Sequence, residues 1–197
     1  MARPGGNITG VTAYGRETWG KRLQILKEAV PSASRVAFLA MRTEWEGEVA
    51  ELLDAGRKLQ ISVIGVPLQA STQPEYQRVF AEIAQDRPEA IMVGARAELF
   101  PFRQLILDLV EKSGLPAIYP FREYVELGGL MAYEGDLGEL GRRMADDVHE
   151  ILNGAKPGDI PIYQPTKFEF VINLKAAKAI GLTLPPSVLA RGDEVIE

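Results

Sequence analysis

The chain has 197 residues, of which 46% are hydrophobic and 25% charged, a composition typical of globular proteins that argues against intrinsic disorder. Its formal net charge is −5 and its basic residues are scattered, which excludes the basic surface of a nucleic-acid-binding protein. It has no cysteine, so disulfides, thiolate metal sites and cysteine nucleophiles are excluded as well.

The start of the chain does not read as an export signal. No positively charged segment is followed by an apolar one near the N-terminus, so the chain as given would stay in the cytoplasm. No apolar run approaches the roughly 18 residues needed to cross a bilayer, so we expect no membrane insertion.

Short apolar runs alternate with amphipathic segments along most of the chain, which predicts a parallel sheet flanked by helices. Strands are expected at residues 8–13, 35–40, 61–66, 90–94, 117–119, 130–133 and 167–172. Between them, apolar residues recur at helical spacing, as in Trp19, Leu23 and Leu26. The pattern therefore predicts an α/β fold with a Rossmann-like parallel sheet.

The character of the sequence changes after a long helix expected at residues 136–153. Residues 154–165 are rich in glycine and proline and predict a linker. Residues 166–197 hold too little regular structure to bury a core of their own, so they must pack on the main sheet, on another chain or on a lobe that this sequence lacks. We expect a ligand-binding lobe at 1–153, followed by this linker and this tail.

Catalytic and cofactor motifs are missing from the sequence. His149 is the only histidine, and it lies in a predicted helix among acidic residues, which favours a solvated helix face over a catalytic triad. The pairs Gly5-Gly6 and Gly128-Gly129 precede strands, so they match neither a dinucleotide fingerprint nor a P-loop. Without a nucleophile elbow or a metal-ligand set, we expect no enzyme activity, no metal and no cofactor.

Polar and aromatic side chains gather where the predicted strands end, and ligands of open α/β sheets bind beyond the carboxyl ends of their strands. Arginine can bind a ligand carboxylate, glutamate can accept from an amino group, and tyrosine gives an apolar wall with a polar tip. The sequence thus predicts a site for a small polar ligand, although any one of these residues alone could be an ordinary polar loop residue. Its expected wall residues are Arg42, Arg96, Tyr119, Arg122, Tyr133 and Glu134.

Several segments, in order, resemble the ABC-transporter substrate-binding family related to tryptophan- and other amino-acid-binding lipoproteins. They are Ala2–Gly10, Gly20–Leu23, Leu26–Pro31, Leu115–Tyr119, Phe121–Glu123, Gly128–Tyr133, Ile151–Pro157, Gln164–Lys175 and Arg191–Glu197. The resemblance covers nearly the whole chain and implies one lobe of a type I periplasmic binding protein, in which two Rossmann-like lobes close over a ligand. It also implies an amino acid or related carboxylate as ligand, an ABC permease as partner and a periplasmic location.

The sequence departs from the family in two ways. The first lobe and the export signal of the family are missing, so we expect a truncated relative or a fragment whose residues 166–197 return to the other lobe. Met41–Trp45 and Glu134 also differ from the family pattern, so ligand identity does not transfer. A second hypothesis is a regulatory, sensor or interaction module that homodimerises through the surface left by the missing lobe.

Overall fold

The computed structural model describes residues 4–12 and 18–197, which fall into two compact units. The sheet unit contains residues 18–134 and 169–197 of this described part, and the helix unit contains residues 4–12 and 135–168. The chain therefore enters and leaves the sheet unit at two places that are far apart in sequence.

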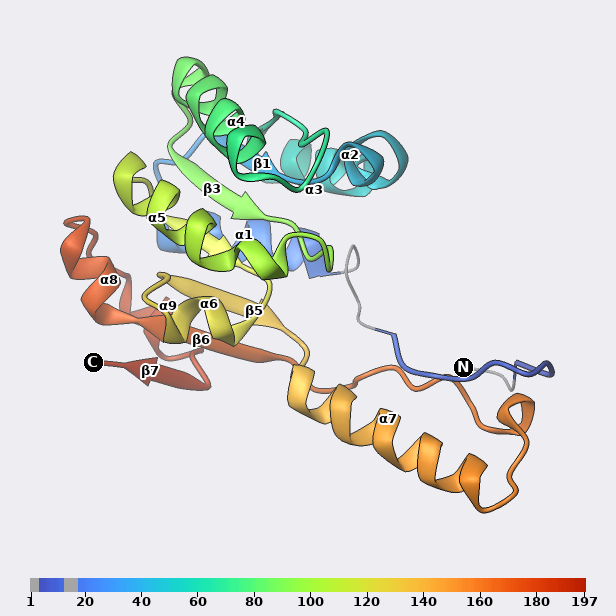
Figure 1. Cartoon of the computed structure of the whole chain (residues 1–197). Coiled ribbons are helices and arrows are strands. Elements are labelled where there is room, and N and C mark those ends of the chain that lie inside the picture. Colours follow the sequence, from blue (N-terminus) through green and yellow to red (C-terminus); the bar gives the residue numbers. More distant parts are fainter. Residues whose placement is uncertain (1–3, 13–17) are drawn as a thin grey trace. The chain divides into compact units, whose positions relative to one another are not determined.

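The sheet unit contains a seven-stranded sheet, in the order β2-β1-β3-β4-β5-β6-β7, within the described residues (Figure 1). β1 to β5 pair in parallel, β6 runs antiparallel to β5, and β7 is parallel to β6. The α/β class predicted from the sequence is confirmed. The strands are β1 (Arg35–Leu39), β2 (Ser62–Gly65), β3 (Ala90–Val93), β4 (Ala117–Tyr119), β5 (Met131–Glu134), β6 (Glu169–Asn173) and β7 (Glu194–Ile196).

Helices cover both faces of this sheet. On one face α1 packs against α3 and α9, and on the other α5 packs against α4 and α6. The predicted apolar stripe of α1 is confirmed, since Trp19, Leu23 and Leu26 are all buried. The helices of the sheet unit are α1 (Trp19–Ala29), α2 (Arg42–Glu48), α3 (Ala50–Lys58), α4 (Gln73–Asp86), α5 (Arg103–Ser113), α6 (Arg122–Glu126), α8 (Leu174–Ala179) and α9 (Pro186–Leu189), with the 3-10 turn η2 (Phe100–Phe102) before α5.

The C-terminal segment joins the same sheet. β6 pairs with β5 from Met131↔Ile172 to Glu134↔Glu169, and β7 then pairs with β6. This placement differs from the expected division, which gave residues 166–197 to another lobe. The physical reason is that β5 would otherwise present unpaired backbone groups at a sheet edge, and an apolar strand without a core of its own satisfies them.

The helix unit combines α7 (Leu137–Leu152) and the 3-10 turn η3 (Pro157–Asp159) with two extended segments. The Asp136 side chain caps α7 by accepting a hydrogen bond from the Gly138 backbone at 2.7 Å. The predicted linker is tied to the start of the chain, because Tyr163 pairs with Val11 and its backbone N–H donates to Gly10 at 2.9 Å. The strand expected at 8–13 is thus an isolated bridge, and its last residue lies outside the described residues.

Candidate functional site

The carboxyl ends of the parallel strands carry three charged side chains that are almost fully buried. They are Arg22 from α1, Glu44 from α2 and Glu134 at the end of β5, with exposed fractions of 0%, 2% and 3%. Charged side chains are rarely buried to this extent unless they are paired or functional. We call these three residues the buried charge cluster.

Arg22 is the cation of the buried charge cluster. Its Nη1 donates to the Val93 carbonyl at the end of β3, at 2.8 Å. Its Nε and Nη2 have no hydrogen-bond partner within the described part of the chain. Burial lowers the pKa of Arg22, while Glu134 and Glu44 act in the opposite direction. The guanidinium is therefore held by the Val93 carbonyl, experiences the charges of two carboxylates and keeps unused hydrogen-bond donors.

Glu44 lies in the first turn of α2, with its carboxylate directly above Gly94. A Cβ atom at residue 94 would come within 2.8 Å of Glu44 Oε2, so a larger residue there would displace the carboxylate. Burial raises the pKa of Glu44 to about 7, although Arg96 and Arg22 partly oppose this shift. The group is thus close to its titration midpoint at neutral pH, and Oε2 has no hydrogen-bond partner among the described residues.

Glu134 is the last residue of β5, and it is held from the start of α1. The Thr18 hydroxyl donates to Glu134 Oε2 at 2.8 Å, and Thr18 is itself buried. This hydrogen bond joins the start of α1 to the end of β5 and fixes the orientation of the Glu134 carboxylate.

The rim of the site is formed by less buried residues. Arg96, just after β3, forms an ion pair with Glu48 of α2, and both side chains are about one-third exposed. Arg42 Nε lies 3.9 Å from Glu46 Oε1, and the Arg42 side chain is 56% exposed. The guanidinium of Arg42 is therefore more accessible to a ligand than that of Arg96. The half-buried Trp45 covers the strand ends nearby, packing over Gly65 and against Phe38.

Three of the expected wall residues come together at this edge. Arg96 interacts electrostatically with Glu44, Arg42 begins the helix that carries Glu44, and Glu134 belongs to the buried charge cluster. Their convergence follows from the parallel topology, which brings the carboxyl ends of successive strands to one side.

The structure places the other three expected wall residues elsewhere. Tyr119 is buried and stacks on Tyr124, with ring centroids 4.9 Å apart. The Tyr133 ring packs against Phe170, on the opposite face from Glu134, since successive strand residues alternate. Arg122 begins α6, and its guanidinium forms ion pairs with three neighbouring carboxylates.

Those carboxylates belong to Glu126, Glu169 and Glu194, whose oxygens lie 2.9, 2.6 and 2.8 Å from nitrogens of Arg122. The hydrogen bonds that Arg122 donates to Glu126 and Glu194, together with the charge of Glu169, raise the pKa of Arg122 and outweigh the effect of its partial burial. The arginine therefore links α6 to β6 and β7, a role in the fold and not in the site.

Two residues of the buried charge cluster, Arg22 and Glu44, were not among the expected site residues. A signal for Arg22 does exist, since it lies three residues after Trp19 and four before Leu26, on the apolar stripe of a helix. A charged residue on the apolar face of a helix is expected to be buried together with its apolar neighbours. Glu44 gives no comparable signal, because its burial depends on Gly94, far away in sequence.

Across residues 4–12 and 18–197, no group of three or more histidine, cysteine, aspartate or glutamate residues is placed to hold a metal ion. None of the helices described there is both long and apolar enough to cross a membrane.

The sequence matches a known family over almost its whole length. The model for ABC transporter substrate binding protein matches residues 1–196. The chain is also 22% identical, over 184 residues, to the tyrosine-binding protein of Clostridioides difficile (strain R20291), covering 92% of this chain and 52% of that protein. It thus spans about half the length of this curated relative.

Solved structures share the fold. The conserved domain protein from Vibrio cholerae matches with a TM-score of 0.87 at 22% identity, over 98% of this chain and 64% of that chain. The ABC domain from Streptococcus pneumonia in complex with L-Trp matches with a TM-score of 0.85 at 24% identity, over 98% and 66% of the two chains. The fold of a substrate-binding protein, predicted by resemblance, is confirmed.

Proposed function

Because the chain belongs to the ABC transporter substrate-binding protein family, we propose that it binds an amino acid at the carboxyl edge of its sheet. In this proposal the protein works outside the cytoplasm and delivers its ligand to an ABC permease. The observation that carries the proposal is the buried charge cluster, which lies where open α/β sheets bind their ligands.

The charge balance of the buried charge cluster favours a ligand with an ammonium group. The cluster holds two carboxylates and one guanidinium, so it carries excess negative charge when Glu44 is ionised. Glu44 Oε2 lacks a hydrogen-bond partner within the described residues, and an ammonium group would supply one. A buried carboxylate gains most from a partner that brings both a positive charge and hydrogen-bond donors.

The rim favours a carboxylate on the same ligand. Arg42 is exposed and only loosely paired, so it can turn toward a ligand carboxylate with two parallel hydrogen bonds. Arg96 can do the same if it releases Glu48. An ammonium group and a carboxylate a few ångströms apart are the shared part of every amino acid.

The neighbouring aromatic surface favours a ligand with a ring. Trp45 is half-buried beside Glu44 and offers an apolar ring to a bound side chain. Two similar proteins point the same way, since one is named a tyrosine-binding protein and the other was solved in complex with L-Trp. Closure of a second lobe over such a ligand would complete the site in the whole protein.

Calorimetry of the full-length protein with a panel of amino acids tests this function. We expect aromatic amino acids to bind, and analogues without the α-amino group, such as indole-3-propionate, to bind at least tenfold more weakly. The Glu44→Gln variant should lose a similar factor. Its matched control is Glu46→Gln on the same helix, whose side chain is exposed. No binding anywhere in the panel, or equal effects of the two variants, would overturn the proposal.

A second candidate function, association of two copies of the chain, is favoured by one surface of the helix unit. Met144, Val148 and Leu152 on α7 are 48%, 55% and 81% exposed. Such apolar surfaces drive association when they are contiguous. Light scattering over a concentration series should then show a dimer that Val148→Lys abolishes, whereas a monomer at all concentrations would exclude this alternative.

A further inference from the structure

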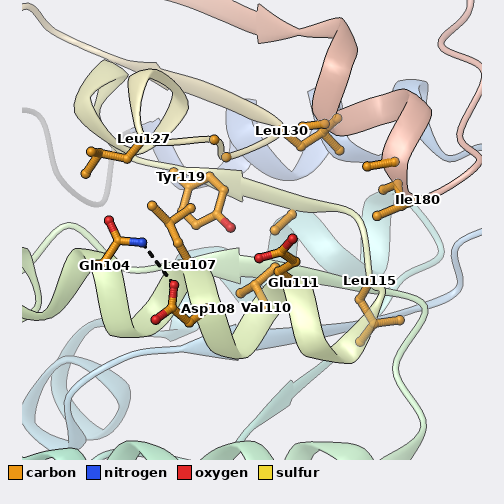
Figure 2. A pocket seen from close by; sticks show the side chains of 15 residues that line it. Gln104, Leu107, Asp108, Val110, Glu111, Leu115, Tyr119, Leu127, Leu130 and Ile180 are labelled. Carbon is orange, nitrogen blue, oxygen red and sulfur yellow. Dashed lines mark hydrogen bonds between the residues drawn. The ribbon is translucent and has the colours of Figure 1, made fainter.

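A cavity of about 210 Å³ lies in the sheet unit, apart from the buried charge cluster (Figure 2). Helices α5 and α8 and the segment after α6 enclose it. Leu115, which precedes β4, and Leu130, which precedes β5, both line it, so it lies toward the amino ends of these parallel strands. The buried charge cluster lies at the opposite, carboxyl ends.

The walls of the cavity are mainly apolar. Leu107 and Val110 come from α5, Leu130 directly precedes β5 and Ile180 directly follows α8. Leu127 belongs to the same lining and is 46% exposed. An apolar cavity of about 150 Å³ in another protein admits benzene, so this one is large enough for a ring with a short chain.

One buried polar group faces this apolar space. Tyr119 is 1% exposed, and Figure 2 shows its hydroxyl directed into the cavity, on the side of Glu111. Within residues 4–12 and 18–197 no hydrogen bond involves this hydroxyl, which opens onto the cavity, although a tyrosine hydroxyl on such a buried side chain normally finds a partner. A polar atom of a bound molecule would provide that partner.

The charged residues of the lining are all acidic. Asp108 and Glu111 lie on neighbouring turns of α5, and the residues that line the cavity include no lysine, arginine or histidine. Asp108 accepts a hydrogen bond from Gln104 at 2.9 Å, which leaves its charge uncompensated. The site therefore combines apolar walls with an electrostatic preference for a cation.

We propose that this cavity is a second binding site, which takes a small organic cation: a primary amine carried on an aromatic or branched apolar body. The body fills the space between Leu107, Leu130 and Ile180. The ammonium group binds Asp108 and Glu111, and the Tyr119 hydroxyl supplies a further hydrogen bond. This ligand needs no carboxylate, and its site lies apart from the carboxyl edge of the sheet. The proposal therefore stands independently of the amino-acid site proposed above.

Phenethylamine is a suitable probe, with the neutral 2-phenylethanol and the anionic phenylacetate as matched comparisons. We expect ¹H–¹⁵N NMR titration of the whole chain to shift residues of α5, α8 and the segment after α6. Phenethylamine should bind at least tenfold more tightly than the alcohol, and phenylacetate should not bind. Saturation with an amino acid that occupies the carboxyl edge should leave this titration unchanged.

Three variants locate the binding. The double change Asp108→Asn with Glu111→Gln should remove the advantage of the amine over the alcohol, whereas Glu51→Gln, an exposed acidic residue on α3, should not. Ala179→Phe fills the cavity from an exposed position on α8 and should abolish binding of both compounds. Equal affinities for amine and alcohol in the parent protein, or shifts confined to other parts of the sheet unit, would overturn the proposal.

Discussion

Two arginines of the sheet unit, Arg22 and Arg122, show how the same chemistry serves different purposes at different places. Arg122 is partly exposed, and three carboxylates occupy its guanidinium. Arg22 is fully buried, holds one carbonyl and keeps two nitrogen atoms without partners among the described residues. An arginine whose donors are all paired stabilises the fold, whereas a buried arginine with unpaired donors is able to bind a further molecule, as we propose for the carboxyl edge of the sheet.

This comparison predicts that Arg22→Met has the largest effect on stability. The change leaves Glu44 and Glu134 buried without the cation whose charge acts on both, and removing the compensating partner of a buried charge costs about 3–5 kcal/mol. Urea unfolding at pH 8 measures the loss. Arg42→Met is the matched control, because Arg42 is exposed and should change the free energy of unfolding by less than about 0.5 kcal/mol. Equal losses of unfolding free energy for the two variants would show that Arg22 does not stabilise the buried carboxylates Glu44 and Glu134.

The next effect in size concerns Glu44 and pH. Its pKa rises from 4.5 to about 7 on folding, so the folded protein binds this proton more tightly than the unfolded chain does. Stability from this group is therefore fully present below about pH 4.5 and is lost as the pH rises toward about 7, by about 3 kcal/mol at most.

Glu44→Gln should remove this dependence on pH. The variant should be more stable than the parent protein above pH 7, with the difference vanishing toward pH 4.5, and unfolding measured at a series of pH values tests this. Glu46→Gln, with an exposed side chain, should follow the parent at every pH. Parallel profiles for all three proteins would contradict the burial of an ionisable Glu44. A variant that is more stable and yet binds ligand more weakly would mark Glu44 as a functional residue.

Much of the fold could be predicted from the sequence, because strands buried on both faces are continuous apolar runs. The strand expected at 117–119 agrees with β4, and those expected at 35–40 and 90–94 differ from β1 and β3 by one residue at the C-terminal end. β7 was not predicted, since three residues with an acidic start carry no such signal. Its formation depends on the backbone of β6.

The site was harder to predict than the fold. The order of strand ends brings Arg42, Arg96 and Glu134 to the edge where we propose the ligand to bind, but a continuous apolar run does not reveal which face each residue points to. Tyr119 therefore faces the cavity beneath α5 and not the carboxyl edge. Arg22 and Glu44 are defined by their burial around Val93 and Gly94, which only the tertiary structure brings together.

Arg122→Met gives the smallest expected effect and completes the comparison. Its three ion pairs are partly exposed, and such pairs contribute about 1 kcal/mol or less because solvent and salt screen them. Thermal unfolding should show a small loss that shrinks further in 1 M salt, while the affinity for an amino acid should not change. A large loss of affinity with unchanged stability would reverse the roles of the two arginines. It would then place Arg122 in the wall of the site, as its position after β4 first suggested.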